Sequence, residues 1–295
     1  MITHETPFKS KVGAIIQARC NSTRLEKKVL RKMPHGLGVS IIEQIIHRIS
    51  KCSDINEVIV ATSVENDDDE IVSLCKSKNI ACFRGSKNNV LERFYEASRY
   101  FGLHHIVRLT ADNPFFDHSV LSACINYHLV NRCDYTKTCY YPLGTNVETF
   151  TSEALEIAYN NASTEFEKEH VTPYFYKTQP ELFKIGSLCA PPELQDNTLR
   201  LTIDTEQDYA MANVIYEILL QEKGNDFNLE DIISLCRNKP WISSINKDIY
   251  QKRIYNSIVD ELNEAVKLID KADMTQASTI LKEEIKKISA STVKV

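Results

Sequence analysis

The 295-residue sequence contains no apolar run that approaches the roughly 18 residues of a membrane-spanning helix. Residues 1–11 are polar and lack the apolar centre of a secretory signal peptide. Internal repeats and low-complexity linkers are also absent from the sequence. We therefore expect a globular protein that does not have a membrane as a partner.

Paired cysteine motifs are missing as well. The nine cysteines are scattered, and none forms the C-x-x-C spacing of many zinc and redox sites. Because an odd number of cysteines fits poorly with a disulfide framework, we expect reduced thiols in a cytoplasmic protein. Cys75, Cys82 and Cys124 lie in stretches with an apolar pattern and are expected in the core.

The sequence has no excess of positive charge. Its 35 lysines and arginines are outnumbered by 40 acidic residues, which gives a net charge of −5. This balance argues against non-specific binding to nucleic acid. Any site for an anion must therefore come from a local concentration of cations.

The clearest concentration of cations follows the first apolar run, at residues 12–16, which has the composition of a buried parallel strand. The loop after it combines positive charges with hydroxyl and amide donors, at Arg19, Asn21, Ser22, Thr23, Arg24, Lys27 and Lys28. Ligands of open α/β sheets bind beyond the carboxyl ends of strands, where cations suit phosphate groups. The loop is thus either a phosphate site or a solvated surface loop.

Apolar runs alternate with amphipathic segments along most of the chain, which is typical of α/β proteins. Further strands are expected at residues 57–62, 79–84, 106–110, 183–188 and 199–203. Helices are expected at residues 39–52, 66–77, 118–130 and 152–160, after residue 90 and from residue 205. Residues 248–295 should form a helical extension, broken near 273–275, that packs on the 12–247 domain or on a second subunit.

Two aspartates follow predicted strands that are far apart in sequence. Asp112 comes after residues 106–110, and Asp204 after residues 199–203. Two carboxylates at one sheet edge are what a Mg²⁺–phosphate site requires, although an aspartate before a turn can simply cap it. The D-x-D pair of Asp67 and Asp69 opens a helix, where it fits complementation of the helix dipole better than a metal.

The cationic loop resembles a family signature, A-R-x-x-S-T-R-L-P-x-K-x-L, at Ala18, Arg19, Ser22, Thr23, Arg24, Leu25, Lys28 and Leu30. This is the signature of cytidylyltransferases that activate acidic sugars, in the spore coat polysaccharide (SpsF-like) branch related to 3-deoxy-manno-octulosonate and acylneuraminate synthetases. Asn21, Glu26 and Lys27 stand where this branch usually has glycine, proline and often glycine. The resemblance implies a Rossmann-like nucleotide-diphospho-sugar transferase fold (GT-A-like), with a mixed, mostly parallel sheet flanked by helices.

Further segments resemble the same branch. Residues 84–94 are similar to R-G-S-x-x-x-V-L-x-R-[FY], which implies base and ribose contacts from Arg84, Ser86, Asn89 and Arg93. Arg93 could equally form a structural ion pair with Glu92 or Glu96. Residues 110–114 and 201–208 resemble T-[GA]-D-x-P and [WL]-T-[VI]-D-T-x-x-D, in which Asp112 and Asp204 would be the metal ligands.

Two more segments imply contacts to the acceptor. Residues 144–150 resemble G-x-x-V-E-V-F, which makes Tyr141, Asn146 and Glu148 candidates, with packing as the alternative for the tyrosine. Residues 167–174 resemble R-E-H-V-T-P-Y, in which His170 is a pocket residue, a general base or a structural histidine at a subunit contact.

The resemblance implies a Mg²⁺-dependent cytidylyltransferase that transfers CMP from CTP to a small anionic, sugar-like acceptor for surface polysaccharide synthesis. Arg19, Arg24 and Lys28 would hold the triphosphate, and Asp112 and Asp204 would hold Mg²⁺. We expect a homodimer. A GT-A-type glycosyltransferase and a degenerate nucleotide-binding scaffold remain alternatives.

Overall fold

The computed structural model describes residues 10–22, 24–36, 38–250 and 257–292, and the side chains of these residues as far as 289. The chain divides into two compact units, Met1–Asp248 and Ile249–Val295. Each unit is described by itself.

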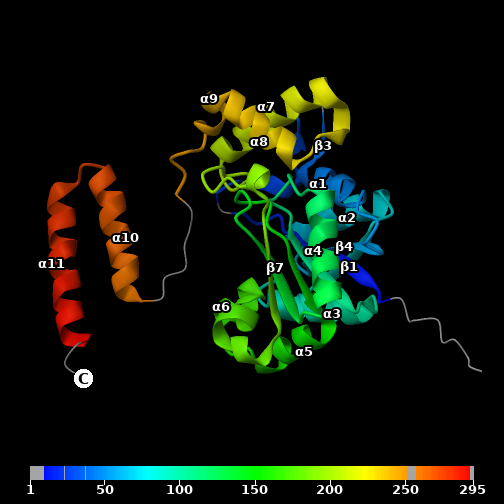
Figure 1. Cartoon of the computed structure of the whole chain (residues 1–295), viewed down its shortest axis with the longest axis horizontal. Helices are drawn as coiled ribbons and strands as arrows, with labels where there is room; N and C mark the ends of the chain where they lie inside the picture. The colour runs from blue at the N-terminus through cyan, green and yellow to red at the C-terminus, as the bar shows by residue number, and fades with distance from the viewer. Residues whose placement is uncertain (1–9, 23, 37, 251–256, 293–295) are drawn as a thin grey trace, which may run out of the picture. The chain divides into compact units, whose positions relative to one another are not determined.

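A seven-stranded sheet forms the centre of the first unit, in the order β5-β4-β1-β6-β8-β7-β9 (Figure 1). Its strands are β1 (Val12–Gln17), β4 (Glu57–Ser63), β5 (Ala81–Gly85), β6 (His105–Thr110), β7 (Tyr135–Cys139), β8 (Glu148–Thr151) and β9 (Ile185–Cys189). Only β8 runs against its neighbours, and every other pairing is parallel. The expected mixed, mostly parallel sheet is confirmed. A separate two-stranded hairpin pairs β2 (Lys32–Met33) with β3 (Val39–Ser40).

Helices cover both faces of this sheet. One face packs against a core built from α1 (Ile41–Ile49), α2 (Asp69–Ser77), α4 (His118–Asn131), α7 (Glu206–Lys223), α8 (Leu229–Asn238) and α9 (Pro240–Ser243). The other face packs against α3 (Val90–Tyr100), α5 (Ser152–Asn161) and residues 171–183, which follow α6 (Glu165–His170). Single turns complete the unit: η1 (Lys28–Leu30), η2 (Asn66–Asp68), η3 (Tyr174–Thr178), η4 (Pro180–Leu182), η5 (Pro192–Leu194) and η6 (Gly224–Asp226).

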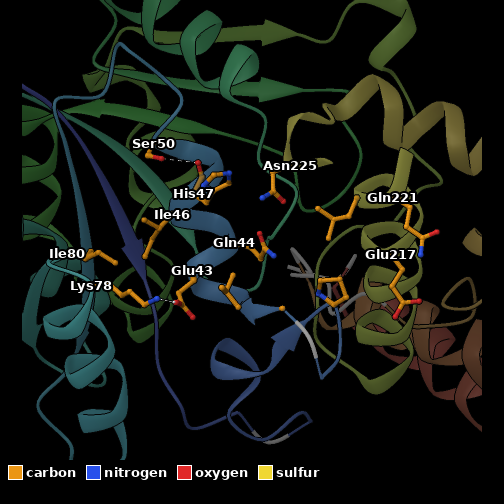
Figure 2. A pocket seen from close by; sticks show the side chains of 14 residues that line it. Glu43, Gln44, Ile46, His47, Ser50, Lys78, Ile80, Glu217, Gln221 and Asn225 are labelled. Carbon is orange, nitrogen blue, oxygen red and sulfur yellow. Dashed lines mark hydrogen bonds and ion pairs between the residues drawn. The ribbon is translucent and has the colours of Figure 1, made fainter. Parts of the chain in front are cut away.

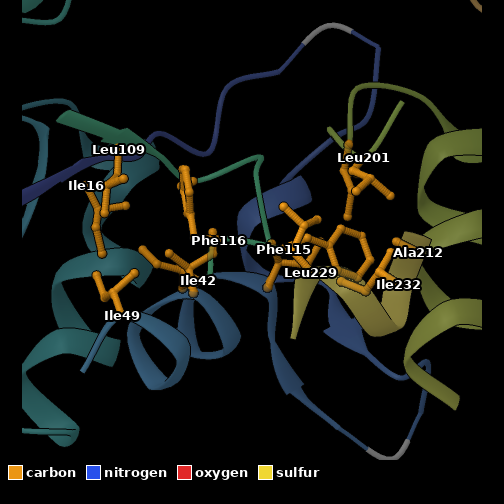
Figure 3. Close-up of a cluster of buried hydrophobic side chains, with 14 of the residues drawn as sticks. Ile16, Ile42, Ile49, Leu109, Phe115, Phe116, Leu201, Ala212, Leu229 and Ile232 are labelled. Carbon is orange, nitrogen blue, oxygen red and sulfur yellow. The ribbon is translucent and has the colours of Figure 1, made fainter. Parts of the chain in front are cut away.

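The larger core links the central strands to helices that come much later in the chain. Figure 3 shows Ile16 of β1 and Leu109 of β6 facing Ile42 and Ile49 of α1. In the same view, Leu201 lies among side chains of α7 and α8. Burial of these apolar groups therefore fixes the segment before α7 against the sheet.

The strand order places a topological switch point beside β1. The chain leaves β1 to form β4 and β5 on one side, and β6 lies on the other side. Ligands of open α/β sheets bind at such a switch point, beyond the carboxyl ends of the strands. Here the two ends are linked, because the Ala111 amide donates to the Gln17 carbonyl at 3.0 Å.

The prediction of a sheet strand at residues 199–203 is wrong. This segment is buried and extended, but it pairs with a turn through the single bridge Leu143–Arg200. Gly144 makes the close pairing possible, because a side chain there would come within 2.5 Å of the Thr202 backbone nitrogen. The alternation of apolar residues correctly predicted an extended backbone, but the segment pairs with a turn and not with the sheet.

The second unit is a helical hairpin of α10 (Ile258–Lys271) and α11 (Thr275–Thr292). The chain turns at Asp273, which has φ 56, so the predicted break near residues 273–275 is confirmed. Within the described parts of the chain, no helix has the length and apolar character needed to cross a bilayer.

We predict that a chain ending at Asp248 folds on its own. Among the described residues of the second unit, Val266 is the only buried apolar one, so the buried core belongs to the first unit. The melting midpoint, followed by circular dichroism, should stay within about 3 °C of that of the full chain. Loss of a cooperative transition in the shortened chain would contradict this expectation.

Candidate active site

A buried ammonium group joins three distant parts of the chain. The Lys28 Nζ donates to Asp112 Oδ2, to Asp204 Oδ1 and to the Ile203 carbonyl, each at 3.0 Å. The Lys28 side chain is only 12% exposed. Burial lowers the pKa of this amine, but the two carboxylates outweigh burial and leave the pKa raised. Lys28 therefore remains charged between the two aspartates.

The backbone brings the two aspartates together. Asp112 follows β6, where its Oδ1 accepts a 2.6 Å hydrogen bond from the Thr110 hydroxyl. The Ile203 amide donates to the Asp112 carbonyl at 2.8 Å, directly before Asp204. The expected meeting of Asp112 and Asp204 is thus found, although Asp204 comes from the extended segment before α7 and not from a sheet strand.

A second cation, Arg200, also binds Asp204, and the sequence did not lead us to predict it. Arg200 contacts Asp204 Oδ2 at 3.0 Å and forms two parallel bonds with Asp208, at 2.8 and 3.0 Å. Asp208 also caps the backbone amides of Asp204 and Thr205 at the start of α7. A signal was present: an arginine within a buried apolar segment needs a buried counter-ion.

The charges around these two carboxylates keep both ionised. Burial acts to raise the pKa of Asp204, but Lys28, Arg24 and Arg200 together lower it. Burial likewise acts to raise the pKa of Asp208, and the bonds from Arg200 and Asn246 lower it. The site is thus a compact ion network in which each carboxylate has a cationic partner.

The loop after β1 presents further cations at the same edge. Arg24 is 48% exposed and lies 3.2 Å from Asp204, while Arg19 is exposed. Ser22 is half-buried, and Thr23 lies outside the described residues. The Ala18 amide donates to the Ala61 carbonyl at 3.0 Å, which extends the pairing of β1 with β4 beyond the strand ends.

Asp68, from the acidic run before α2, anchors this loop. Its carboxylate accepts from the Cys20 amide at 2.7 Å and from Ser63. Lys27 pairs with Glu70 and has a left-handed backbone, φ 47 and ψ 31. Lys27, and not Asn21, is therefore the loop position that glycine would suit, at a saving of about 1–2 kcal/mol.

Residues 84–94, which were predicted to contact the base and ribose, make several hydrogen bonds within the protein. All three nitrogens of the Arg84 guanidinium are engaged, with Ser63, Asp69 and Glu65. Asn89 caps α3, and its backbone amide donates to the Ser86 hydroxyl. These bonds use three of the five N–H donors of the guanidinium, so a nucleotide contact from Arg84 would have to come from the remaining two.

Arg93 is a buried cation without a carboxylate partner among the described residues. Its Nη1 donates to the Ser86 carbonyl at 2.8 Å, and its buried Nε has no hydrogen-bond partner. Burial and then the charge of Arg19 lower the pKa of Arg93 to about 10. The expected alternative of an ion pair with Glu92 or Glu96 is not found, and Arg93 is buried with Arg19 as a neighbouring cation and Asp68 as an opposing charge.

The candidate acceptor residues are not all brought together. Glu148 accepts from Arg108 at 2.7 Å and from the Tyr135 hydroxyl at 2.5 Å, in a polar group on the sheet. Tyr141 is a core residue, 6% exposed, and burial raises its pKa to about 12. Asn146 is exposed.

His170 is separated from the ion network. It is the last residue of α6, and the centroid of its ring lies 4.7 Å from that of the Phe166 ring. In Figure 1, α6 lies with α5 at the end of the first unit that is away from α7 and α8. This position favours the structural interpretation of the histidine.

A pocket of about 840 Å³ lies elsewhere in the first unit, between α1 and the end of α7 (Figure 2). It includes Glu43, which pairs with Lys78 at 2.9 Å, and none of the ion-network residues lines it. The charged network at the sheet edge, and not this pocket, is therefore the candidate active site.

We predict that Asp208→Asn lowers the free energy of unfolding at pH 7 by about 3–5 kcal/mol, the usual effect of breaking a buried ion pair. The folded-state pKa of Asp208 lies below its ordinary value of 3.8. Its contribution is therefore complete above pH 3.8 and is lost as the pH falls through the folded-state pKa.

Urea titrations at several pH values measure this effect. The variant should lose part of the acid sensitivity of the wild-type protein. The exposed Asp226, which pairs with Lys51, supplies the control Asp226→Asn, and this variant should behave like the wild type. Equal stability of the two variants would contradict a structural role for the Arg200–Asp208 pair.

Known proteins are similar to this chain in sequence and fold. The family model described as cytidylyltransferase matches residues 13–259. An uncharacterised protein of Methanocaldococcus jannaschii is 38% identical over 244 residues, which cover 82% of this chain and 97% of that protein. The spore coat polysaccharide biosynthesis protein SpsF of Bacillus subtilis is 33% identical over 233 residues, 77% of this chain and 94% of SpsF.

A solved structure extends the likeness to three dimensions. A cytidylyltransferase from Leptospira borgpetersenii superposes with a TM-score of 0.72 at 30% identity, covering 84% of this chain and 100% of that one. The expected resemblance is confirmed in both sequence and fold. The chain belongs to the cytidylyltransferase family, as an SpsF-like member.

Proposed function

We propose that the ion network catalyses Mg²⁺-dependent transfer of CMP from CTP to a small anionic, sugar-like acceptor, with release of pyrophosphate. Family membership makes the chain a CTP-dependent nucleotidyltransferase. The observation that carries the finer proposal is the position of Lys28, bound to both Asp112 and Asp204 near the switch point between β1 and β6.

The residues present fit a magnesium ion. Mg²⁺ binds through one or two carboxylates, with phosphate oxygens and water completing an octahedron. Asp112 and Asp204 each lie 3.0 Å from the same amine, so both carboxylates are close enough to share one cation. When bound, Mg²⁺ would neutralise phosphate charge and polarise the phosphorus that is attacked.

The chain's own cations would bind the triphosphate. Lys28 is held in place by two carboxylates, and an incoming phosphate group would become a further partner for its amine. Arg24, half exposed beside Asp204, can turn to the leaving pyrophosphate. Donors positioned before the reaction stabilise the charge that develops as pyrophosphate leaves.

Arg93 and Arg19 form a second cationic position. A buried guanidinium without a close carboxylate is costly, and a phosphate oxygen bound beside Arg19 would lower that cost. Because Arg19 is the nearby cation that lowers the pKa of Arg93, one anionic group could contact both. This pair of arginines supports binding of the nucleotide beyond the carboxyl end of β1.

The acceptor is proposed to lie over the polar group on β6, β7 and β8. The side chains of Arg108 and Glu148 are only 15% and 19% exposed, so their charges are largely shielded from water. A small sugar acid offers the hydroxyl and carboxylate groups that these two side chains can bind. The similarity of the chain to the spore coat polysaccharide biosynthesis protein SpsF supports a role in surface polysaccharide synthesis.

We predict that Asp112→Asn and Asp204→Asn each leave less than about a tenth of wild-type turnover, because each removes one anionic metal ligand. Pyrophosphate release from CTP is measured with a panel of sugar acids at saturating Mg²⁺, and the CMP-linked product is identified by mass. The control Asp67→Asn changes an exposed acid of η2 and should keep full activity.

This panel also separates the possible outcomes. Substantial turnover by either variant, with its fold intact by circular dichroism, would contradict the assignment of these aspartates. CTP binding without product from any acceptor would favour the degenerate scaffold. Equal product from CTP, UTP, ATP and GTP would contradict the expected preference for cytidine.

We predict that Lys28→Ala and Arg24→Ala each cost about 2–4 kcal/mol of transition-state stabilisation, measured as kcat/KM for CTP. Lys87→Ala is the matched control, because Lys87 forms only a distant surface pair with Glu65, at 3.8 Å. If all three variants have the wild-type kcat/KM, the cationic loop is only a solvated surface.

A further inference from the structure

Two thiols lie side by side near one edge of the sheet, away from the ion network. Cys139 ends β7 and Cys189 ends the edge strand β9, and the parallel register pairs these two residues directly. The Sγ of Cys139 donates a hydrogen bond to the Sγ of Cys189 at 2.7 Å. Neighbouring strands are about 4.8 Å apart, within the ~4.4–6.8 Å that separates Cα atoms of bonded cysteines. The spacing of the two strands therefore permits a bond between the two sulfurs.

This pair differs from the other cysteines in its access to solvent. Cys189 is the exposed cysteine of the chain and Cys139 is half-buried, whereas six of the remaining seven are buried. Burial, and then the hydrogen bond and charge of Cys189, raise the pKa of Cys139 to about 11. Cys139 thus keeps its proton at neutral pH, and Cys189 is the sulfur that a small oxidant can reach.

We propose that Cys139 and Cys189 form a redox-active dithiol, which hydroperoxides oxidise to an intramolecular disulfide. The Cys189 sulfur attacks the O–O bond of the peroxide, takes up one oxygen as a sulfenic acid, and the second oxygen leaves as water or alcohol. The Cys139 sulfur then attacks the Cys189 sulfur, the S–O bond breaks, and the hydroxyl leaves as water with the Cys139 proton. Two thiols lose two electrons in total, and the peroxide gains them.

The position of the pair connects it to the ion network. Both strands leave the sheet at these cysteines, where the Ala190 amide donates to the Cys139 carbonyl at 2.8 Å. The segment after Cys139 pairs with the segment after Cys189 through the Leu143–Arg200 bridge. A disulfide would therefore tie the start of the segment that leads to Arg200 and Asp204 to the start of the segment whose Leu143 pairs with Arg200. An effect of the disulfide on enzymatic activity would rest on the proposed function, whereas formation of the disulfide does not.

Peroxide treatment of the full-length protein tests the disulfide directly. After oxidation, free thiols are alkylated under denaturing conditions, and unreduced peptides are sequenced by mass spectrometry. We expect two of the nine thiols to escape alkylation, a linked Cys139–Cys189 peptide, and full reversal by dithiothreitol. The oxidised protein should melt about 5 °C or more above the reduced one, because the crosslink restricts the unfolded chain.

Two serine variants provide the comparison. Cys189→Ser should abolish both the linked peptide and the shift in melting temperature. Cys82→Ser removes the half-buried member of the hydrogen-bonded pair Cys75–Cys82 and should leave both unchanged. A sulfinic acid on Cys189 without a crosslink, a different linked pair, or a link between two chains would each overturn the proposal. None of these readouts depends on turnover of CTP.

Discussion

A single charged amine joins the segments that form the candidate active site of this cytidylyltransferase. Lys28 comes from the loop after the first strand, Asp112 from the end of β6, and Asp204 from the segment before α7. A buried amine of this kind is stable only with carboxylate partners, and two close carboxylates are stable only with a cation between them. The three segments therefore stabilise one another in this arrangement.

The surrounding structure keeps this arrangement in place before any substrate binds. Arg200 binds both Asp204 and Asp208, and the Asn246 side chain donates to Asp208 at 2.9 Å. Leu201, packed between α7 and the sheet core, prevents this segment from moving away (Figure 3). The proposed chemistry asks mainly for positioned charge, which is what such a network supplies.

Much of the fold and part of the site could be predicted from the sequence. The parallel strands appeared as apolar runs, and the two aspartates followed such runs, so their meeting at one edge could be expected. Arg200 was missed although its place in an apolar segment signalled a buried counter-ion, and the structure identifies Asp204 and Asp208 as its partners. His170 and Tyr141 were placed near the acceptor by resemblance, whereas in the structure α6 lies away from the network and Tyr141 is in the core. Sequence patterns report burial well but do not report which buried groups face one another.

Metal binding tests the account most directly. Mn²⁺, a paramagnetic substitute for Mg²⁺, can be titrated by electron paramagnetic resonance in the presence of a CTP analogue with a methylene group between its α- and β-phosphorus atoms. The account predicts tight binding to the wild-type protein and to Asp67→Asn, and binding weakened by about tenfold or more in Asp112→Asn and Asp204→Asn. Equal Mn²⁺ affinity in all four proteins would show that Asp112 and Asp204 are partners of Lys28 and not ligands of the metal.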